Sequence, residues 1–213
     1  LPRRPASGRL CLRLAGDGER VGQDPGAGER QHHVAVRRER DRRFGRVAGL
    51  GLAETYTPSL RPDDPDPKAW KLAEPISIEF ATLRTRLLPS LVDAARRNLE
   101  LGSEDIALFE VARIYLPDGD LPEEHTHVAG IVEGGWHRAK GLVEALYAAL
   151  KAETLFGRTT DDLLHPGKAA SVGAGIVGEL HPAALEGVWG VFELDLAGLL
   201  EAANEDVRYQ DVI

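Results

Sequence analysis

The stretch from Leu88 to Leu116 constrains the fold of this chain more than any other. Its first half carries apolar residues at offsets of 0, 3, 4, 7 and 11, the spacing of one helix face: Leu88, Leu91, Val92, Ala95 and Leu99. Pro89 suits the first turn of a helix, and Gly102 suits the position just after its end. The second half is a nearly continuous apolar run, which is typical of a buried strand. We therefore predict a helix over Pro89–Leu101 that packs on a central strand over Ile106–Leu116.

Downstream of this unit, short strand and helix patterns alternate. The predicted strands are Val128–Glu133, Ser171–Gly173, Gly175–Leu180 and Val188–Leu194, and the predicted helices are Gly141–Lys151 and Leu196–Ala203. Small residues around Gly173 and Gly175 indicate a hairpin, into which His165–Ala170 leads. Pro62–Pro67 predicts a rigid polar loop. The expected fold class is α+β, an antiparallel sheet flanked by helices.

Composition indicates a globular chain in a reducing compartment. The 213 residues are 43% hydrophobic, yet no run approaches the roughly 20 apolar residues that a membrane span needs. We see no charged-then-apolar leader, so we expect neither secretion nor a membrane partner. Cys11 is the single cysteine, so it forms no intrachain disulfide, and no catalytic partner for it is evident. The expected location is cytoplasmic.

The net charge of −8 is the sum of two regimes of opposite charge, a basic N-terminal segment and an acidic remainder of the chain. Residues 1–46 contain twelve Arg and six acidic residues, or +6, whereas the other 167 residues carry 14 basic and 28 acidic residues, or −14. The first regime lacks apolar periodicity, so we predict an irregular Arg-rich segment over residues 1–46, a linker remnant or an altered reading frame. Its arginines could bind phosphate, but no nucleic-acid motif frames them, and a solvated charge run is favoured. Gly26–Arg30 resembles a phosphate loop only by chance, because no strand flanks it.

Five later segments are similar to consecutive signatures of one known family. They are Gly49–Leu60, Leu83–Pro89 (L-R-T-R-L-L-P), His165–Ala170, Gly178–Pro182 and Val191–Leu196. In this order they resemble the class II aminoacyl-tRNA synthetase-like core of the phenylalanyl-tRNA synthetase beta subunit. The resemblance covers about residues 49–213, with residues 1–10 as a further candidate, so we expect a catalytic-like core domain over residues 47–213.

The resemblance also implies that this core performs no adenylation. Catalytic class II cores place an Arg directly after the central strand, where it holds the α-phosphate, and Leu116 stands there in this chain. Arg113 lies inside the strand pattern, so a structural or interface role is favoured for it. The second phosphate-binding signature of the family ends in Arg, but the corresponding Val191–Ala197 offers Glu193 and Asp195, which would repel ATP. A metal role for these two acids is disfavoured, because they sit two apart on an apolar strand.

The histidines allow a second kind of chemistry, which we weigh against a structural role. His125 and His127 lie near Glu123 and Glu124 and could form a metal patch, but no third ligand is spaced for it, so a polar loop is favoured. His165 and His181 each precede Pro, which predicts turns whose histidines bond to the backbone. No G-x-S-x-G nucleophile elbow is present in the sequence. We therefore assign no catalytic, cofactor-binding or metal-binding residue.

The resemblance implies a structural role within a ligase. We expect a non-catalytic core, inactive in isolation, that supports assembly with the catalytic alpha subunit in an α2β2 complex, where ATP and Mg act at the alpha subunit and tRNA binds other parts. The helix Pro89–Leu101 and the strand Ile106–Leu116 are the expected organisers of the alpha-facing surface. Two alternatives stay open: a free-standing metal-dependent hydrolase that uses the His and acid clusters, and a nucleic-acid-binding module that acts through the Arg-rich segment.

Overall fold

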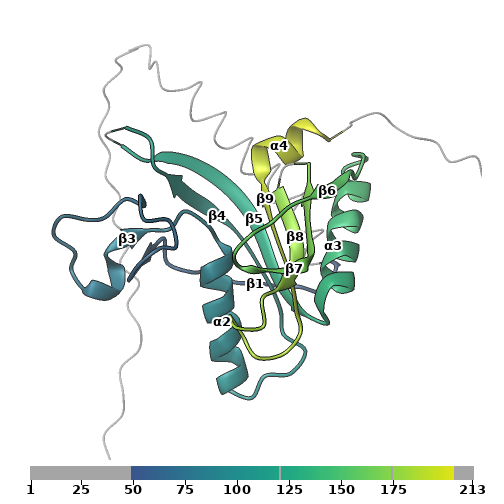
Figure 1. Ribbon diagram of the computed structural model, residues 1–213, viewed down its shortest axis with the longest axis horizontal. Coiled ribbons are helices and arrows are strands. Elements are labelled where there is room, and N and C mark those ends of the chain that lie inside the picture. Colours follow the sequence, from purple (N-terminus) through teal and green to yellow (C-terminus); the bar gives the residue numbers. More distant parts are fainter. Residues whose placement is uncertain (1–48, 120, 174, 204–213) are drawn as a thin grey trace, which may run out of the picture. The chain divides into compact units, whose positions relative to one another are not determined.

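A seven-stranded sheet forms the centre of the structure (Figure 1). The computed structural model describes residues 49–119, 121–173 and 175–203, which belong to the second of two units of the chain, Asp41–Ile213. The strand order is β1-β4-β5-β9-β8-β7-β6, and every neighbouring pair except the parallel pair β1–β4 is antiparallel. The strands are β1 Ala53–Glu54, β4 Ala107–Leu116, β5 Glu123–Glu133, β6 Phe156–Arg158, β7 Leu164–Val172, β8 Gly175–Leu180 and β9 Trp189–Asp195. The fold therefore mixes α and β structure, with a sheet that is antiparallel apart from its first pair.

Helices cover both faces of this sheet, because successive strand residues point to opposite faces and both sets are apolar. Helices α3 (Gly135–Ala149) and α4 (Leu196–Glu201) pack on one face, and α2 (Leu88–Glu100) packs on the other (Figure 1). The first core contains Phe109, Val128, Val143, Tyr147, Phe192 and Leu199. The second contains Leu88, Leu91, Ala95, Ile131, Trp189 and Val191.

The predicted helix–strand unit is confirmed. Helix α2 runs Leu88–Glu100 with Pro89 in its first turn, and its apolar face is buried against the sheet. Gly102 follows the end of the helix with a φ of 78°, a left-handed conformation that glycine adopts without steric cost. Strand β4 runs Ala107–Leu116, within one residue of the expected start. Strand β9 and helix α4 also lie where the sequence predicted a last strand and a closing helix.

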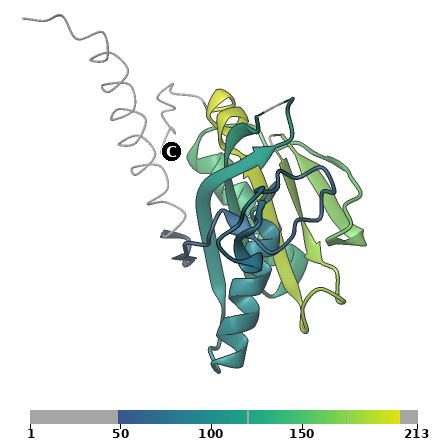
Figure 2. The same ribbon diagram turned by 90° about the vertical axis from the view of Figure 1, so that its left-hand side faces the viewer.

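A small lobe precedes α2 and lies in front of its first turns in Figure 2. It consists of β2 (Leu60–Arg61), a 3-10 turn η1 (Ile78–Phe80) and β3 (Thr82–Leu83), with β2 and β3 paired. The predicted polar loop Pro62–Pro67 directly follows β2, in the segment that leads to η1. Asp64 fixes the loop, because its carboxylate accepts hydrogen bonds from the backbone N–H and the hydroxyl of Thr85, at 2.9 and 2.6 Å.

Three predicted boundaries are wrong. Strand β5 begins at Glu123 rather than Val128, because residues 123–127 pair in register with residues 112–116 of β4. Helix α3 begins at Gly135 rather than Gly141. Its first turns are mainly polar, so they show no apolar residues at helical spacing. His165–Ala170 lies inside β7 instead of leading into a strand. The short strand β6 carries too few residues for a strand pattern and was not predicted.

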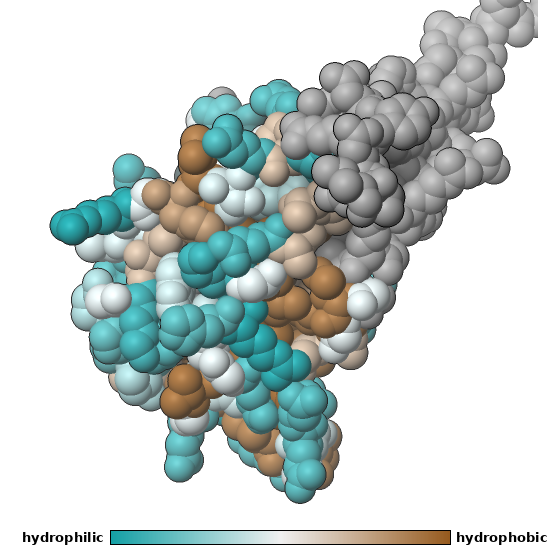
Figure 3. Space-filling view, turned by 90° about the vertical axis from the view of Figure 1, so that its right-hand side faces the viewer, coloured by the Kyte–Doolittle hydropathy of each residue, from teal (hydrophilic) through white to brown (hydrophobic). Residues whose placement is uncertain are grey.

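Several expectations lie outside the described residues. They are the irregular character of residues 1–46, Cys11 and the glycine-containing Gly26–Arg30. In the part of the chain that the structure describes, no helix has the length and apolar content to cross a membrane. On the face that carries α3, polar and apolar side chains are interspersed, and the apolar areas are separated by polar ones (Figure 3).

Candidate functional site

The candidate site is the α2 face of the sheet, where strands β4, β5 and β9 meet the segment that leads into α2. Leu116, which the family resemblance aligns with the phosphate-binding Arg of catalytic cores, ends β4 and packs against the α2 core. Arg113 lies on the exposed part of β4, and its guanidinium is 2.8 Å from the Glu124 carboxylate on β5. The structural role expected for Arg113 is therefore a cross-strand ion pair.

Glu193 occupies the centre of this face. Its carboxylate is buried and accepts hydrogen bonds from the backbone N–H groups of Leu87 and Leu88, at 2.9 and 3.2 Å. These groups begin α2, whose N-cap residue Leu87 supplies no side-chain hydrogen bond. A carboxylate at a helix N-terminus satisfies unpaired donors and interacts favourably with the helix dipole. Glu193 therefore caps a helix that begins 105 residues earlier in the chain.

Two side chains with ring or guanidinium nitrogens, His127 and Arg86, flank the Glu193 carboxylate. His127 Nδ1 lies 2.9 Å from Glu193 Oε1, and Arg86 Nε lies 3.8 Å from Glu193 Oε2. Arg86 also forms an ion pair of 2.9 Å with Asp161. The charges that could receive a phosphate on this face are thus engaged by carboxylates of the chain itself.

Arg84 forms a second buried ion pair beside the first. Its guanidinium lies 3.3 Å from Glu110 Oε1, donates to the Thr57 hydroxyl at 2.8 Å and donates to the Arg113 carbonyl at 2.9 Å. Glu110 accepts two further hydrogen bonds, from the Thr57 N–H and hydroxyl. Every charge in this group has a partner, as burial requires. The pair fastens the chain before β2 and the chain before α2 to β4.

Sequence reasoning missed the roles of Arg84, Arg86 and Glu110, although a signal was present. Each is an ionised side chain inside an otherwise apolar segment, L-R-T-R-L-L-P or A-L-F-E-V-A. Such groups are rarely buried without a partner. A charged residue inside an apolar segment therefore indicates that an ion-pair or hydrogen-bond partner exists, but the sequence does not show which residue provides it.

The histidine pair departs from its prediction. His125 and His127 lie in strand β5, so the polar loop expected there is wrong. His125 Nε2 is 3.2 Å from Glu123 Oε1, while His127 faces Glu193. Among the described residues, no group of three or more His, Cys, Asp or Glu side chains could hold a metal ion.

His165 and His181 both bond to the backbone, as predicted. His165 Nδ1 accepts from the Gly167 N–H at 3.0 Å, and His181 Nδ1 accepts from the Ala183 N–H at 3.2 Å. His181 precedes a turn, whereas His165 lies in β7, where the β7–β8 register shifts, so the turn expected at His165 is wrong.

The second acid of the last strand has a separate role. Asp195 is the N-cap of α4, and its carboxylate accepts from the Ala197 and Gly198 N–H groups at 3.4 and 2.9 Å. Glu179 on β8 acts similarly at α3, accepting from the Trp136 N–H at 3.3 Å and from Lys168 Nζ at 2.6 Å. The Lys168 hydrogen bond lowers the pKa of the Glu179 carboxyl, against the opposing effect of burial. Strand carboxylates thus cap α2, α3 and α4.

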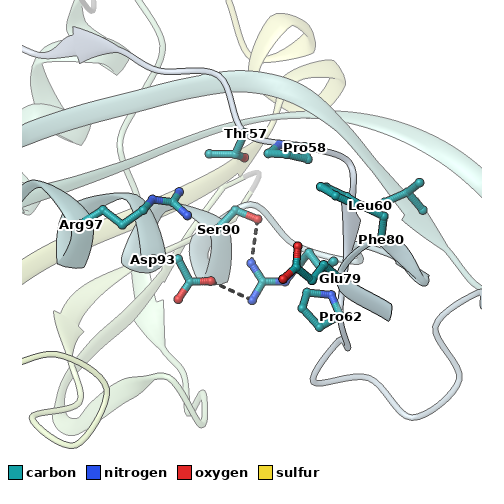
Figure 4. Close-up of a pocket in the computed structure, with 10 residues that line it drawn as sticks. Thr57, Pro58, Leu60, Pro62, Glu79, Phe80, Ser90, Asp93 and Arg97 are labelled. Atoms are coloured by element: carbon teal, nitrogen blue, oxygen red, sulfur yellow. Dashed lines mark hydrogen bonds and ion pairs between the residues drawn. The ribbon is translucent and has the colours of Figure 1, made fainter. Parts of the chain in front are cut away.

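A pocket of about 410 Å³ lies between the lobe and α2 (Figure 4). It is lined by Thr57, Pro58, Leu60, Arg61, Pro62, Glu79, Phe80, Ser90, Asp93 and Arg97. Arg61 crosses it, donating to Ser90 Oγ at 2.9 Å and pairing with Asp93 at 3.1 Å. The pocket lies on the lobe side of α2, and its lining residues are distinct from the Glu193 cluster.

The comparisons with known proteins agree with this geometry. The family described as "Phenylalanyl tRNA synthetase beta chain CLM domain" matches residues 28–196. The "Phenylalanine--tRNA ligase beta subunit" of Listeria monocytogenes is 35% identical over 198 residues, 78% of this chain and 25% of that protein. The same-named protein of Geobacillus kaustophilus is 34% identical over 213 residues, 83% of this chain and 26% of that protein. The chain therefore spans about a quarter of the length of these relatives.

A solved structure supports the fold independently. The pyrrolysyl tRNA synthetase PylSc of Desulfitobacterium hafniense matches with a TM-score of 0.57 and 15% identity, covering 86% of this chain and 79% of that chain. At this identity the likeness concerns the fold alone. It agrees with a class II synthetase-like architecture for the sheet and its helices.

Proposed function

Because the chain belongs to the phenylalanyl-tRNA synthetase beta-chain family, we propose that it is a non-catalytic core that supports a catalytic alpha subunit in charging tRNA with phenylalanine. In this proposal ATP and Mg act at the alpha subunit of an α2β2 complex in the cytoplasm, and tRNA binds other parts of that complex. The observation that carries the non-catalytic role is the Glu193 cluster, which fills the catalytic-like face with the chain's own charges.

The electrostatics of that face support this assignment. Adenylation joins a carboxylate to a triphosphate, so an active site must supply cations to two anionic reactants. Here Arg84 and Arg86 are held by Glu110, Asp161 and Glu193, and Leu116 adds no charge. A triphosphate at this face would have to displace buried ion pairs, which costs several kcal/mol.

Phenylalanine-dependent pyrophosphate exchange tests the catalytic part of the proposal. We expect no exchange above background from this chain alone, and exchange from the alpha subunit combined with the full-length beta subunit. Exchange by the chain alone would overturn the assignment. If that exchange also survived replacement of both Arg84 and Arg86, a different site would have to carry it.

Co-purification with the cognate alpha subunit tests the assembly part. We expect a complex of alpha with the full-length beta subunit at micromolar concentrations. Absence of any complex would contradict the role in assembly. Neither alternative function gains support from the geometry: the histidines and acids are engaged in pairs and caps, and the Arg-rich segment lies outside the described residues.

A further inference from the structure

The hairpin of β4 and β5 ends in a turn that carries an Asp-Gly pair, Asp118 and Gly119. The two strands stay paired up to Leu116 and Glu123, whereas β9 accompanies β5 only as far as His127. The end of the hairpin therefore extends beyond the neighbouring strand (Figure 1). Both residues of the pair are exposed, so solvent reaches them at this free end.

The sequence of this pair matters for its chemistry. When glycine follows aspartate, the backbone nitrogen of the glycine attacks the aspartate side chain readily, because glycine has no side chain to hinder the approach. Within the described residues, Asp118 is the only aspartate with a glycine directly after it. The other Asp-Gly pair of the chain, Asp17 and Gly18, lies outside the described residues.

The contacts of Asp118 also differ from those of most other aspartates. Asp64 accepts from Thr85, Asp66 accepts from the Lys68 N–H, Asp93 pairs with Arg61 and Arg96, Asp105 pairs with Arg138, Asp161 pairs with Arg86, and Asp195 caps α4. The Asp118 carboxylate forms no hydrogen bond or ion pair with any residue that the structure describes, and the Gly119 N–H donates to none of them. Both reacting groups are therefore available.

The space around Gly119 is open. Its φ is 49°, in the left-handed region that glycine adopts without steric cost, and a Cβ built there would meet no atom within 4 Å. The backbone of the turn can therefore rotate to bring the Gly119 nitrogen onto the Asp118 side chain without displacing a neighbour. The folded structure does not protect this pair.

We propose that Asp118 is a site of spontaneous isoaspartate formation in the folded chain. In the first step the Gly119 nitrogen bonds to Cγ of the neutral Asp118 carboxyl group. The Cγ–OH bond breaks, the hydroxyl leaves with the amide proton as water, and a five-membered succinimide remains. The reaction is favoured because both groups are held next to each other in one chain.

The second step adds the water back. Opening of the ring at its Cγ–N bond restores aspartate. Opening at the bond between the nitrogen and the Asp118 α-carbonyl carbon gives isoaspartate, in which the main chain runs through Cβ and the former α-carbonyl group is a free carboxylate. Water is lost and regained, so the conversion is redox-neutral and needs no other reactant.

The product is a substrate for one class of enzyme, the isoaspartate-specific protein carboxyl methyltransferases. Such an enzyme moves the methyl group from the sulfonium of S-adenosylmethionine to an oxygen of the new carboxylate. The ester then loses methanol as the succinimide forms again. The exposed turn presents this carboxylate at the end of the hairpin, outside both cores of the sheet. This inference is independent of the proposed function.

Incubation of the folded chain in mildly acidic buffer, followed by trypsin digestion and mass spectrometry, tests the proposal. The tryptic peptide Ile114–Arg138 carries Asp118 and the peptide Leu14–Arg20 carries Asp17, so the two Asp-Gly pairs are measured separately. Backbone fragmentation distinguishes isoaspartate from aspartate. Methyl transfer from labelled S-adenosylmethionine by a purified isoaspartyl methyltransferase counts the product independently.

An internal control is Asp162, an exposed aspartate whose next residue is Leu163. The Leu163 side chain hinders the attacking nitrogen, and its N–H donates to Asp161 at 3.0 Å. We expect isoaspartate at Asp118 to accumulate with time and to exceed that at Asp162 by about tenfold or more, which needs a difference of only about 1.4 kcal/mol between the two barriers.

Two variants identify the reacting side chain. Asp118→Asn should raise the yield of isoaspartate several-fold, because its amide reaches the same succinimide with loss of ammonia. Asp118→Glu should abolish the product, because glutamate would have to close a six-membered ring. Circular dichroism verifies that each variant keeps the fold. Isoaspartate that forms at Asp118 only in urea, or that is equally abundant at Asp118 and Asp162, or that is confined to Asp17, would overturn the proposal.

Discussion

At the residue scale, Glu193 shows how a charge inside an apolar strand can serve a distant helix. Its carboxylate is buried with the two N–H groups at the start of α2 and with His127. The sequence L-L-P at this helix start contains no residue that could cap it. The cap must therefore come from elsewhere in the fold, and β9 provides it.

Replacing Glu193 tests this role. Glu193→Ala leaves buried N–H groups without an acceptor, so we expect a loss of about 2 kcal/mol or more in the free energy of unfolding. Urea unfolding followed by circular dichroism measures it. Glu100→Ala, at the exposed end of the same helix, is the control and should change the stability by less than about 0.5 kcal/mol. Equal effects of the two changes would contradict the capping role.

Glu179 makes stability depend on acid pH. The Lys168 hydrogen bond lowers its folded pKa below the unfolded value, so its contribution is present above the unfolded pKa and disappears as the pH falls through the folded pKa. Lys168→Met should therefore reduce stability at pH 7, by less than about 1 kcal/mol because Lys168 is partly exposed. The difference should vanish in acid below the folded pKa. Lys168→Arg should keep most of the effect, and a difference that grows in acid would refute this account.

At the element scale, glycines set the distance between α3 and β9. A Cβ at Gly190 would overlap the Gly135 carbonyl oxygen and lie 2.8 Å from Ala139 Cβ, so the helix rests directly on the strand backbone. Gly134 and Gly135 begin the helix with φ values of 95° and 70°, which L side chains rarely adopt. Close approach here brings the α3 N-terminus within reach of Glu179.

Paired glycine substitutions measure this contact. Gly190→Ala should cost about 1–3 kcal/mol, because α3 must move away from β9. Gly141→Ala lies on the same helix with no atom within 4 Å of the new Cβ, so it should stabilise by about 0.5–1 kcal/mol through helix propensity. Thermal unfolding of both variants compares them. A neutral Gly190→Ala would show that the helix can shift at little cost.

At the scale of the whole molecule, the opposite charges of residues 1–46 and of the rest of the chain predict how the chain binds tRNA. The residues after 46 carry −14 and should repel an anionic backbone, whereas residues 1–46 carry +6. We expect filter binding of tRNA to be weak and to fall steeply with salt. Replacing Arg37, Arg38, Arg40, Arg42, Arg43 and Arg46 with Ser should remove it. Retention of tRNA by that variant would assign binding to the acidic body and contradict the prediction.

The elements that the sequence predicted well are those with a strong local period. Helix α2, strand β4, strand β9 and helix α4 follow from apolar spacing and from Pro and Gly at the helix ends, because these signals act within a few residues. The departures at β5 and α3 have the opposite cause. The polar residues 123–127 form a strand because they pair with residues 112–116 of β4. The apolar periodicity of residues 123–127 themselves does not indicate this pairing.

The candidate site divides in the same way. The sequence by itself determined that the strand pattern ends in Leu116 and that Val191–Leu196 carries Glu193 and Asp195, and the family resemblance implies that a catalytic core would place an Arg after each of these strands. Only the tertiary structure decided that Glu193 caps α2, that Arg84 pairs with Glu110, and that the apolar face of α2 is buried against the sheet while Ile76 and Ile78 of the lobe are exposed. Hydrogen bonds and burial depend on which distant segments the sheet brings together. The spacing of residues within one segment does not indicate which remote segment will lie next to it.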